Sequence, residues 1–427
     1  MSAKRARKLT RLGRTAHVTQ SGLSHLLRSI DNEGLPSAYS RTSQYRGRRK
    51  TCAELTPYGS LTETVTVGHL PIGVQNPFSM IHMCCSHAEG FAKLMRNTLS
   101  RVQPPWSIVI YADGITPQDP LSKTDERKID TVYWSFLEFA DALCHEEVWL
   151  VLTCARTTEL KKIDGGLSRI VAQLLRDFFF NENGNNFAGA GMKLNLLGDV
   201  EGVQQMPLTA NLAAVLADEP ALHDLLLCKG HAGFKPCVLC QNVVLRRYFD
   251  PCKHGGFAVP HSCTDDSRFV LHSDASIRAS YRRLHSMKNE ISETEFAELE
   301  KVHGWNYSAW GLVHEPFVHA SSQVMFDWMH LYLQSGLIDV EFGQLMRALY
   351  DAGSPVKWAI LNSYMSKWTW PKAVTSPKTE VLFCQSAAKV VWQPAGGFCQ
   401  PSFLVLMGFH GFQWVFVVAT LRPLKTP

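Results

Sequence analysis

Three aspartates in this chain lie where carboxylates could act on a phosphodiester. Asp113 ends the short apolar run SIVIYAD, Asp218 directly follows the apolar run PLTANLAAVLA, and Asp327 lies in the segment FDWMH. Two-metal phosphoryl transfer needs carboxylates from separate segments that converge on two divalent ions. Mg²⁺ accepts a few carboxylates together with water molecules, and strand ends suit such a site because strands fix the direction of the side chains. The three aspartates are therefore candidate catalytic residues, with Asp113 and Asp218 as metal ligands.

Each of these acids also has a simpler interpretation. Asp113 precedes Gly114, and this pair is typical of a hairpin turn. Asp218 could be a helix N-cap, since a proline two residues later suits the first helical turn. Asp199 competes for the role of the second acid, although a turn is the simpler interpretation there. On a helix, Asp327 and His330 would share one face and could present a carboxylate and an imidazole to one metal or phosphate.

The elements that would position these acids follow a recognisable order. Short apolar runs predict strands, and an amphipathic run followed later by an Asp-Glu-Pro start predicts helices. The predicted strands are 107–113, 131–139, 147–155, 192–200 and 207–217. The predicted helices are 166–180, the segment after Asp218, and the long stretch 321–350, which is interrupted near Gly336. Strand, strand, strand, helix, strand, helix is the order of a ribonuclease-H-like fold. The predicted fold class is therefore α/β, with a mixed sheet and flanking helices.

A second group of residues could bind a different metal. Cys237 and Cys240 form a C-x-x-C pair, which can hold one tetrahedral Zn²⁺ from a tight turn. The second ligand pair could be Cys228 and His231, or it could come from residues further along the chain, namely Cys252, His254, His261 and Cys263. A C-x-x-C pair can also be a redox motif or a pair of unligated core thiols. Structural zinc is the prediction, as part of a small Cys/His insertion.

Composition and charge exclude several classes of protein. The chain has 427 residues, with 45% hydrophobic and 19% charged residues, which does not fit a disordered chain or a coiled coil. Its 12 cysteines lack the dense spacing of a disulfide scaffold. Walker, G-x-S-x-G and H-E-x-x-H motifs are absent from the sequence. Residues 403–421 are almost all apolar, but polar residues and glycines interrupt them, so a membrane span is not expected.

Basic residues concentrate at the N-terminus. The first 50 residues contain 12 Lys or Arg and 2 acids, whereas the net charge of the whole chain is +5. Lys/Arg clusters neutralise phosphates, so the second cluster is a predicted DNA contact, formed by Arg46, Arg48, Arg49 and Lys50. The first cluster, within residues 4–8, fits a nuclear localisation signal, an organelle transit peptide or a solvated tail equally well.

Several of these segments together resemble the DDE-type transposases of the CACTA (EnSpm-like) group and their transposon-derived relatives. The matching pieces are IVIYADGITPQDPL, VLADEPALHDLLLCKGHAGFKPCVLCQN and MFDWMHLYLQSGLID. In that group an Asp-x-Pro-Ala-like segment lies about 20 residues before a C-x-x-C pair, and here Cys237 follows Asp218 by 19 residues. The resemblance covers about residues 20–388. A final catalytic Glu usually follows a helical insertion in these enzymes, and its place here is not evident, so a C-terminal truncation is one expectation.

The resemblance implies a function and a domain plan. The function is cleavage and transfer of DNA strands at transposon ends, with Mg²⁺ or Mn²⁺ at the catalytic acids and structural Zn²⁺ in the insertion. DNA is the implied partner, a homo-oligomer is allowed, no small-molecule cofactor is expected, and the location is nuclear. The alternatives are a non-catalytic, zinc-stabilised DNA-binding or interaction protein derived from a transposase, and a membrane-tethered protein. The expected divisions are 1–20 (basic arm), 21–104, 105–227 (first part of the core), 228–265 (zinc insertion), 266–388 (helical region) and 389–427 (apolar tail).

Overall fold

A computed structural model describes four stretches of the chain, which are 55–115, 128–198, 207–327 (apart from 255 and 264) and 337–353. It also describes Arg28, Tyr332 and four two-residue strands, β12 (Val405–Leu406), β13 (Phe409–His410), β14 (Gln413–Trp414) and β15 (Val417–Val418). The predicted basic arm with its Arg/Lys cluster, Asp199 and His330 lie outside the described residues. None of the helices in these stretches is long and apolar enough to cross a membrane.

The chain forms two compact units, Met1–Thr62 and Glu63–Pro427. In the first unit, strands β1 (Leu55–Thr56) and β2 (Gly59–Ser60) form a small antiparallel hairpin. Gly59 has a φ of 107°, a backbone conformation that suits glycine because it lacks a Cβ. The candidate functional residues that the structure describes all belong to the second unit.

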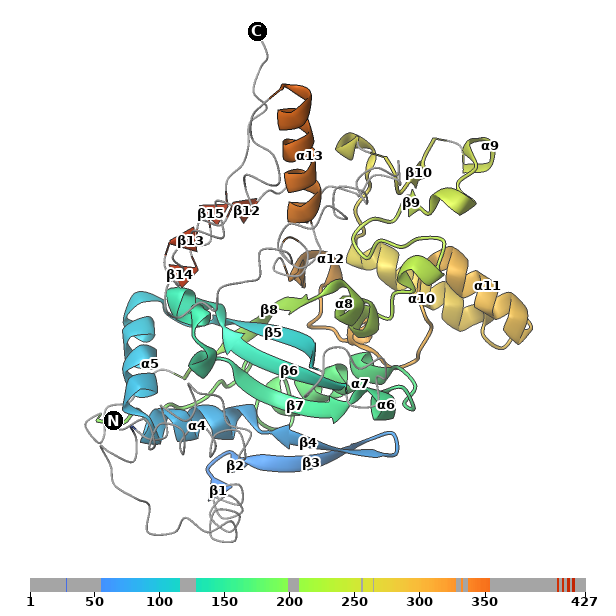
Figure 1. The fold of residues 1–427 in the computed structure, drawn as a ribbon. Helices are drawn as coiled ribbons and strands as arrows, with labels where there is room; N and C mark the ends of the chain where they lie inside the picture. Colours follow the sequence, from blue (N-terminus) through green and yellow to red (C-terminus); the bar gives the residue numbers. More distant parts are fainter. Residues whose placement is uncertain are drawn as a thin grey trace, which may run out of the picture. The chain divides into compact units, whose positions relative to one another are not determined.

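A seven-stranded mixed sheet lies at the centre of the second unit (Figure 1). Its strands, in spatial order, are β11 (Val324–Phe326), β8 (Ala210–Ala217), β5 (Trp106–Ile115), β6 (Ile129–Phe136), β7 (Leu150–Arg156), β4 (Leu70–Gln75) and β3 (Thr62–Val67). Strands β11, β8 and β5 are parallel, whereas β5, β6, β7 and β4 pair antiparallel. The predicted α/β class is confirmed, and the arrangement is compatible with a ribonuclease-H-like core.

An aromatic cluster fills one face of this sheet. Ile108 and Ile110 on β5 lie opposite Phe136 and Trp134 on β6, so these side chains project from the same face. The aromatic cluster, defined here as the rings in mutual contact on this face, consists of Phe78, Trp106, Trp134, Phe136, Phe139, Phe179 and Phe187. Because every member is at most 2% exposed, this face is the main hydrophobic core.

Helices supply the other half of that core. They are α4 (Pro77–His87), α5 (Glu89–Arg101), the single turn α6 (Thr157–Leu160) and α7 (Gly166–Leu174), which continues as a π-helical turn over Leu175–Phe179. Helix α4 begins where the sequence favours it, because the Asn76 side chain accepts hydrogen bonds from the backbone N–H groups of Phe78 and Ser79. The 3₁₀ segments are Leu137–Cys144, Glu146–Val148, Gly230–Ala232, Arg246–Tyr248, Asp266–Arg268 and Leu312–His314.

A large insertion separates β8 from β11. It contains α8 (Glu219–Leu226), the two-stranded parallel pair β9 (Val243–Val244) and β10 (Val259–Pro260), α9 (Pro251–His254), α10 (Asp274–Met287) and α11 (Glu293–His303). The insertion has its own core, centred on Tyr281, Leu284 and Trp305. Helices α10 and α11 both begin with a capping box, at Ser273 and at Ser292, which explains why these polar stretches are helical.

One segment prediction was wrong and a second was wrong in part. Residues 192–198 form no strand, and only Met192 makes an isolated bridge, to Leu208. Within 321–350, helix α13 (Leu337–Asp351) begins directly after the interruption predicted near Gly336, but the first part contains only the single turn α12 (Ala320–Gln323), followed by strand β11. The short run Val-Met-Phe becomes a strand because it adds to the free edge of β8, a tertiary contact that overrides helical periodicity.

Candidate active site at three strand ends

The three candidate acids lie at the ends of three neighbouring parallel strands. In the sheet register, Ala112 on β5 pairs with Ala217 on β8, and Ala217 pairs with Phe326 on β11. Asp113, Asp218 and Asp327 are the next residues in each strand direction, so they occupy equivalent positions along one edge of the sheet. The Asp327 backbone N–H donates to the Ala217 carbonyl over 2.7 Å, which fixes this alignment. Residues more than 200 positions apart in the sequence are thereby brought side by side.

Asp113 is part of a strand and not of a hairpin turn. Strand β5 continues two residues beyond it, and its pairing with β6 includes Asp113 opposite Thr131 and Ile115 opposite Ile129. The side chain of Asp113 is half-buried and projects from the face opposite the aromatic cluster, as expected from the alternation of side chains along a strand. The turn interpretation suggested by Asp113-Gly114 is therefore wrong.

Asp218 is the N-cap of helix α8. Its Oδ1 accepts a hydrogen bond of 2.7 Å from the backbone N–H of Ala221, and Pro220 lies in the first turn, so the predicted cap is confirmed. A carboxylate has two oxygens and about four lone-pair sites, and one backbone hydrogen bond leaves the second oxygen able to accept a further ligand. The cap also holds the carboxylate at the positive end of the helix. The N-cap and metal-ligand roles are therefore compatible.

Asp327 is buried and is held by a tyrosine. The side chain of Asp327 is 9% exposed, and its Oδ2 accepts a hydrogen bond of 3.1 Å from the Tyr111 hydroxyl. Tyr111 lies on β5 two residues before Asp113, so both project from the same face. Burial raises the pKa of the Tyr111 hydroxyl well above its usual range, and the negative charges of Asp113, Asp327 and Asp218 raise it further. The negative charges of all three acids therefore favour the protonated form of the Tyr111 hydroxyl, which remains a hydrogen-bond donor at neutral pH.

Tyr111 was missed by sequence reasoning. It reads as one more residue of an apolar strand, and its role depends on β11, which was expected to be helical. Its ring contacts Tyr133 at 6.1 Å and Trp149 at 6.0 Å between centroids, so it is held between aromatic neighbours. The only available signal was its spacing of two from Asp113, which places both on one face of a strand.

A further acid lies next to this edge. Burial raises the pKa of the Asp224 carboxyl on helix α8, and the nearby charges of Asp130 and Asp218 also raise it, whereas Lys128 and Lys161 lower it. The strand end is thus surrounded by charges of both signs. Sequence reasoning did not select Asp224, because it is one of several polar positions on a short helix.

The helix after β11 carries the next candidate for a third acid. Helix α13 includes Glu341, whose exposed carboxylate accepts a hydrogen bond of 2.7 Å from the Tyr332 hydroxyl. The sequence offered no downstream acid that could be defended as the final Glu. The structure therefore leaves Asp327, at the strand end, as the acid in register with the first two.

The donor atoms of this site fit a hard divalent cation. Carboxylate oxygens are the ligands that Mg²⁺ and Mn²⁺ prefer. Within the described residues, no group of three or more His, Cys, Asp or Glu side chains is close enough to hold one ion. Mg²⁺ usually takes one or two carboxylates and completes its shell with water and substrate phosphates. The three acids therefore fit as a set of partial ligands, whereas they do not form a closed protein cage.

The cysteines of the predicted zinc site are partly brought together. Cys240 belongs to a small buried cluster with Val243 and Val259, against which Cys237 and Cys263 pack. A hydrogen bond with Cys240 lowers the pKa of Cys237 to about 7. Cys228 lies instead in the larger core of the insertion, where burial raises its pKa to about 12. Of the alternative ligands further along the chain, Cys263 is thus the one that packs in the same cluster as Cys237 and Cys240.

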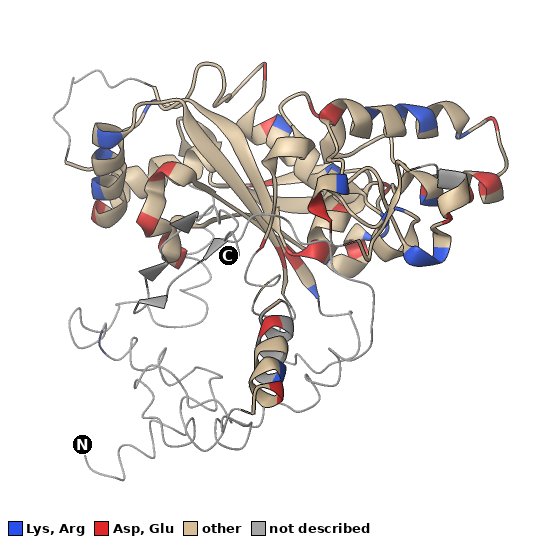
Figure 2. Cartoon of the chain, turned by 90° about the horizontal axis from the view of Figure 1, so that it is seen from above, with Lys and Arg blue, Asp and Glu red and all other residues tan. Residues whose placement is uncertain are grey.

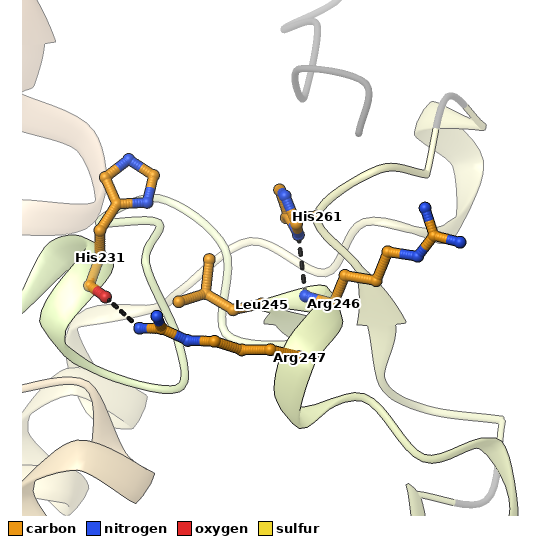
Figure 3. Close-up of a pocket in the computed structure, with 5 residues that line it drawn as sticks. All are labelled: His231, Leu245, Arg246, Arg247 and His261. Atoms are coloured by element: carbon orange, nitrogen blue, oxygen red, sulfur yellow. Dashed lines mark hydrogen bonds between the residues drawn. The ribbon is translucent and has the colours of Figure 1, made fainter. Parts of the chain in front are cut away.

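His231 is placed differently from the expectation. Its imidazole lines a pocket together with Leu245, Arg246, Arg247 and His261, as Figure 3 shows. One histidine from each of the two alternative ligand sets thus lines the same pocket. Cys228 and Cys237 are close enough that the charge of Cys237 raises the pKa of Cys228, so the ligand set Cys228, His231, Cys237 and Cys240 stays a prediction.

Charged residues are unevenly distributed over the described elements. Figure 2 shows acidic residues gathered where the strand ends meet, and residues of both charges on the helices of the insertion. Between Cys228 and Cys263 there are five Lys or Arg and a single acid, Asp250. The acidic strand edge and the basic stretch Cys228–Cys263 within the insertion are the two charged features that bear on function.

Comparison with known protein families and with curated proteins finds no match for this sequence.

Proposed function

We propose that this protein is a DDE transposase-like enzyme that cleaves and transfers DNA strands by two-metal phosphoryl transfer. The single observation that carries the proposal is the alignment of Asp113, Asp218 and Asp327 at the ends of three adjacent parallel strands. Carboxylates that reach one sheet edge from distant segments are what this chemistry requires. The sheet supports a ribonuclease-H-like core, because β5, β6 and β7 are consecutive antiparallel strands and β8 and β11 are added in parallel beside β5.

The residues of the chain have distinct roles in this proposal. Asp113, Asp218 and Asp327 would hold Mg²⁺ or Mn²⁺, which when bound activates the attacking oxygen and stabilises the leaving oxygen. Helix α8 fixes the Asp218 carboxylate through the Ala221 N–H, and the Tyr111 hydroxyl fixes that of Asp327. Because these contacts exist before substrate binds, the acids need little reorganisation to position a phosphodiester.

DNA is the proposed partner and the nucleus the proposed location. The basic N-terminal arm, including Arg46, Arg48, Arg49 and Lys50, would neutralise backbone phosphates and position the DNA without reading its sequence. The stretch Cys228–Cys263 of the insertion, with five Lys or Arg and one acid, would supply further positive charge.

The test of the proposal is metal-dependent cleavage by the full chain. Supercoiled plasmid is incubated with protein in Mn²⁺, Mg²⁺ or EDTA, and calorimetry measures Mn²⁺ binding under the same conditions. Nicking that requires Mn²⁺ or Mg²⁺ supports the proposal, provided that it disappears in the aspartate variants treated in the Discussion. Nicking that persists in EDTA or in these variants comes from a contaminant and contradicts the proposal.

A second candidate function is a non-catalytic DNA-binding protein derived from a transposase. The observation that favours it is that the described acids do not form a group able to hold an ion by themselves. This candidate predicts salt-sensitive DNA binding that is unaffected by Mn²⁺ and unaffected by Asp113→Asn. The same plasmid and calorimetry experiments distinguish the two functions.

Removing the Tyr111 hydroxyl should weaken metal binding. In Tyr111→Phe, the buried Asp327 carboxylate loses its hydrogen bond, and a hydrogen bond to a charged group contributes about 1.5–3 kcal/mol. We expect Mn²⁺ affinity to fall by roughly tenfold or more, while urea denaturation shows a change below about 2 kcal/mol. Tyr133→Phe, on the neighbouring strand, is the matched control and should bind Mn²⁺ normally. Equal affinities for all three proteins would rule out this role for Tyr111.

Zinc is proposed to stabilise the insertion through Cys237 and Cys240, with Cys263 as the third thiol. Thiolates are soft ligands that suit Zn²⁺, and Cys237 already has a lowered pKa. Purified protein should contain about one zinc per chain by elemental analysis, and Cys237→Ser with Cys240→Ser should reduce this to background. Cys154→Ser, which changes an exposed thiol on β7, should retain zinc. Zinc below about 0.2 per chain in the unaltered protein would contradict the proposal.

A further inference from the structure

A pocket of about 490 Å³ opens in the insertion. It is lined by His231, Leu245, Arg246, Arg247 and His261, which come from three separate loops and turns (Figure 3). Its volume lies within the range of roughly 300–1,000 Å³ that is typical of pockets for small ligands. None of these five described lining residues is acidic, so they offer positive charge without an acid among them.

Both arginine side chains have N–H donors that make no hydrogen bond to the described part of the chain. The guanidinium of Arg246 makes no hydrogen bond or ion pair with any residue in the described part of the chain. Arg247 uses one N–H, which donates to the His231 carbonyl over 2.8 Å, and its guanidinium stacks on the Tyr248 ring at 4.8 Å. A guanidinium carries five N–H donors in a planar fork, which matches the oxygens of a phosphate. The pocket can therefore bind an anion without breaking an existing contact.

The two histidines face the pocket from opposite sides. The Nδ1 atom of His261 accepts a hydrogen bond of 2.9 Å from the Arg246 backbone N–H. In the neutral ring the proton is therefore on Nε2, which is left as a donor. In the view of Figure 3, Leu245 lies between His231 and His261. The imidazole faces and the Leu245 side chain provide apolar surface, whereas the Nε2–H of His261 adds a donor to those of the arginines.

We propose that this pocket binds one nucleotide unit of a DNA strand, with its phosphate on Arg246 and Arg247 and its sugar and base against Leu245 and the imidazole rings. The pocket is larger than a single phosphate needs, and its wall combines cationic and apolar groups, as a nucleotide requires. The surrounding segment from Cys228 to Cys263, with five basic residues and one acid, favours a polyanion over an isolated small anion. The inference rests on the proposed function in naming DNA, but it concerns binding and not cleavage.

The test is binding of a fluorescein-labelled single-stranded 20-mer to the full chain, measured by anisotropy over a range of salt concentrations without divalent ions. Arg246→Ala with Arg247→Ala should weaken binding at least about tenfold, since each lost contact is charge-assisted. The slope of log K against log salt should become shallower by roughly 0.7, the value for one phosphate contact on a single strand. The matched control is Arg282→Ala with Arg283→Ala, which removes the same charge from exposed positions on α10 and should change affinity less than about threefold.

Further arms distinguish the outcomes. Arg246→Lys should restore part of the affinity lost in Arg246→Ala, because lysine keeps the positive charge. This variant also keeps the hydrogen bond from the residue 246 backbone N–H to His261. Equal losses in the pocket and control variants would overturn the inference, because they would reflect net charge alone. A deoxynucleoside monophosphate that binds the pocket while the 20-mer does not would assign the site to a free nucleotide and overturn it as well. Asp113→Asn should bind the 20-mer normally, so the loss of cleavage and the loss of pocket binding can be told apart.

Discussion

Replacing Asp113 or Asp218 by asparagine should lower metal-dependent plasmid nicking by at least about 10²-fold, the scale on which removal of one electrostatic group acts in an active site. Asparagine keeps the size of the side chain but removes the negative charge that a divalent ion requires. Both residues lie at equivalent positions of adjacent strands, so each variant should also lose Mn²⁺ binding. The measurements are nicking rate in Mn²⁺ and calorimetric titration with Mn²⁺.

The choice of asparagine separates chemistry from folding at Asp218. Asparagine caps a helix about as well as aspartate, so Asp218→Asn should keep the hydrogen bond from the Ala221 N–H. Asp218→Ala removes the cap as well and should cost about 1 kcal/mol of unfolding free energy. Loss of activity in the asparagine variant, at nearly unchanged stability, would therefore point to the charge. Equal activity in Asp218→Asn and the unaltered protein would make the residue a helix cap and nothing more.

Two further variants identify the third acid. Asp327→Asn should resemble the first two variants, whereas Glu341→Gln on helix α13 should retain activity if Asp327 completes the site. The reverse result would assign the third role to Glu341 and leave Asp327 as a partner of Tyr111. Asp265→Asn is the matched control, because Asp265 also accepts a hydrogen bond from a backbone N–H, that of Ser267, but lies in the insertion. It should leave nicking and Mn²⁺ binding unchanged.

Truncating Trp134 should cost about 3–5 kcal/mol of unfolding free energy, the range for removing a large aromatic side chain from a core. Trp134 is fully buried at the centre of the aromatic cluster, with Phe179 at 5.0 Å and Phe136 at 5.4 Å between ring centroids. Trp134→Ala leaves a cavity that close-packed neighbours on the sheet and on α7 cannot fill. Urea denaturation, followed by circular dichroism, measures the loss.

A conservative variant at the same position should behave very differently. The Trp134 Nε1–H is buried and has no hydrogen-bond partner within the described part of the chain. Trp134→Phe removes this unsatisfied donor, which offsets part of the lost ring area, so its cost should stay below about 2 kcal/mol. Trp310→Ala is the control, because Trp310 is 50% exposed and packs mainly against the Arg169 guanidinium. A similar cost for all three variants would show that the aromatic cluster is not the main source of stability.

Local patterns in the sequence were sufficient for the elements that carry the first two acids. The β-branched run before Asp113 and the Asp-Glu-Pro start after β8 have strong local preferences, and both elements form where expected. The equivalence of Asp113 and Asp218 also followed from the order of the strands. The N-cap at Asp218 could be predicted because a cap depends on the residues directly beside it.

Tertiary structure decided the features that depend on distant partners. A three-residue strand such as β11 has little preference of its own and exists because β8 offers a free edge, which is why a helix was expected there. Asp327 and its partner Tyr111 meet only after that pairing, across 216 residues of sequence. The pocket of the insertion likewise brings His231 and His261 together from separate segments, and no local pattern in the sequence predicts that they meet. The sequence by itself thus determined the α/β class and the elements that carry Asp113 and Asp218, because local periodicity and capping encode them. Asp327 was also a candidate from the sequence, but its position in register with Asp218, its contact with Tyr111 and the pocket of the insertion required the fold, because sheet pairing between remote segments is set by packing and not by local preference.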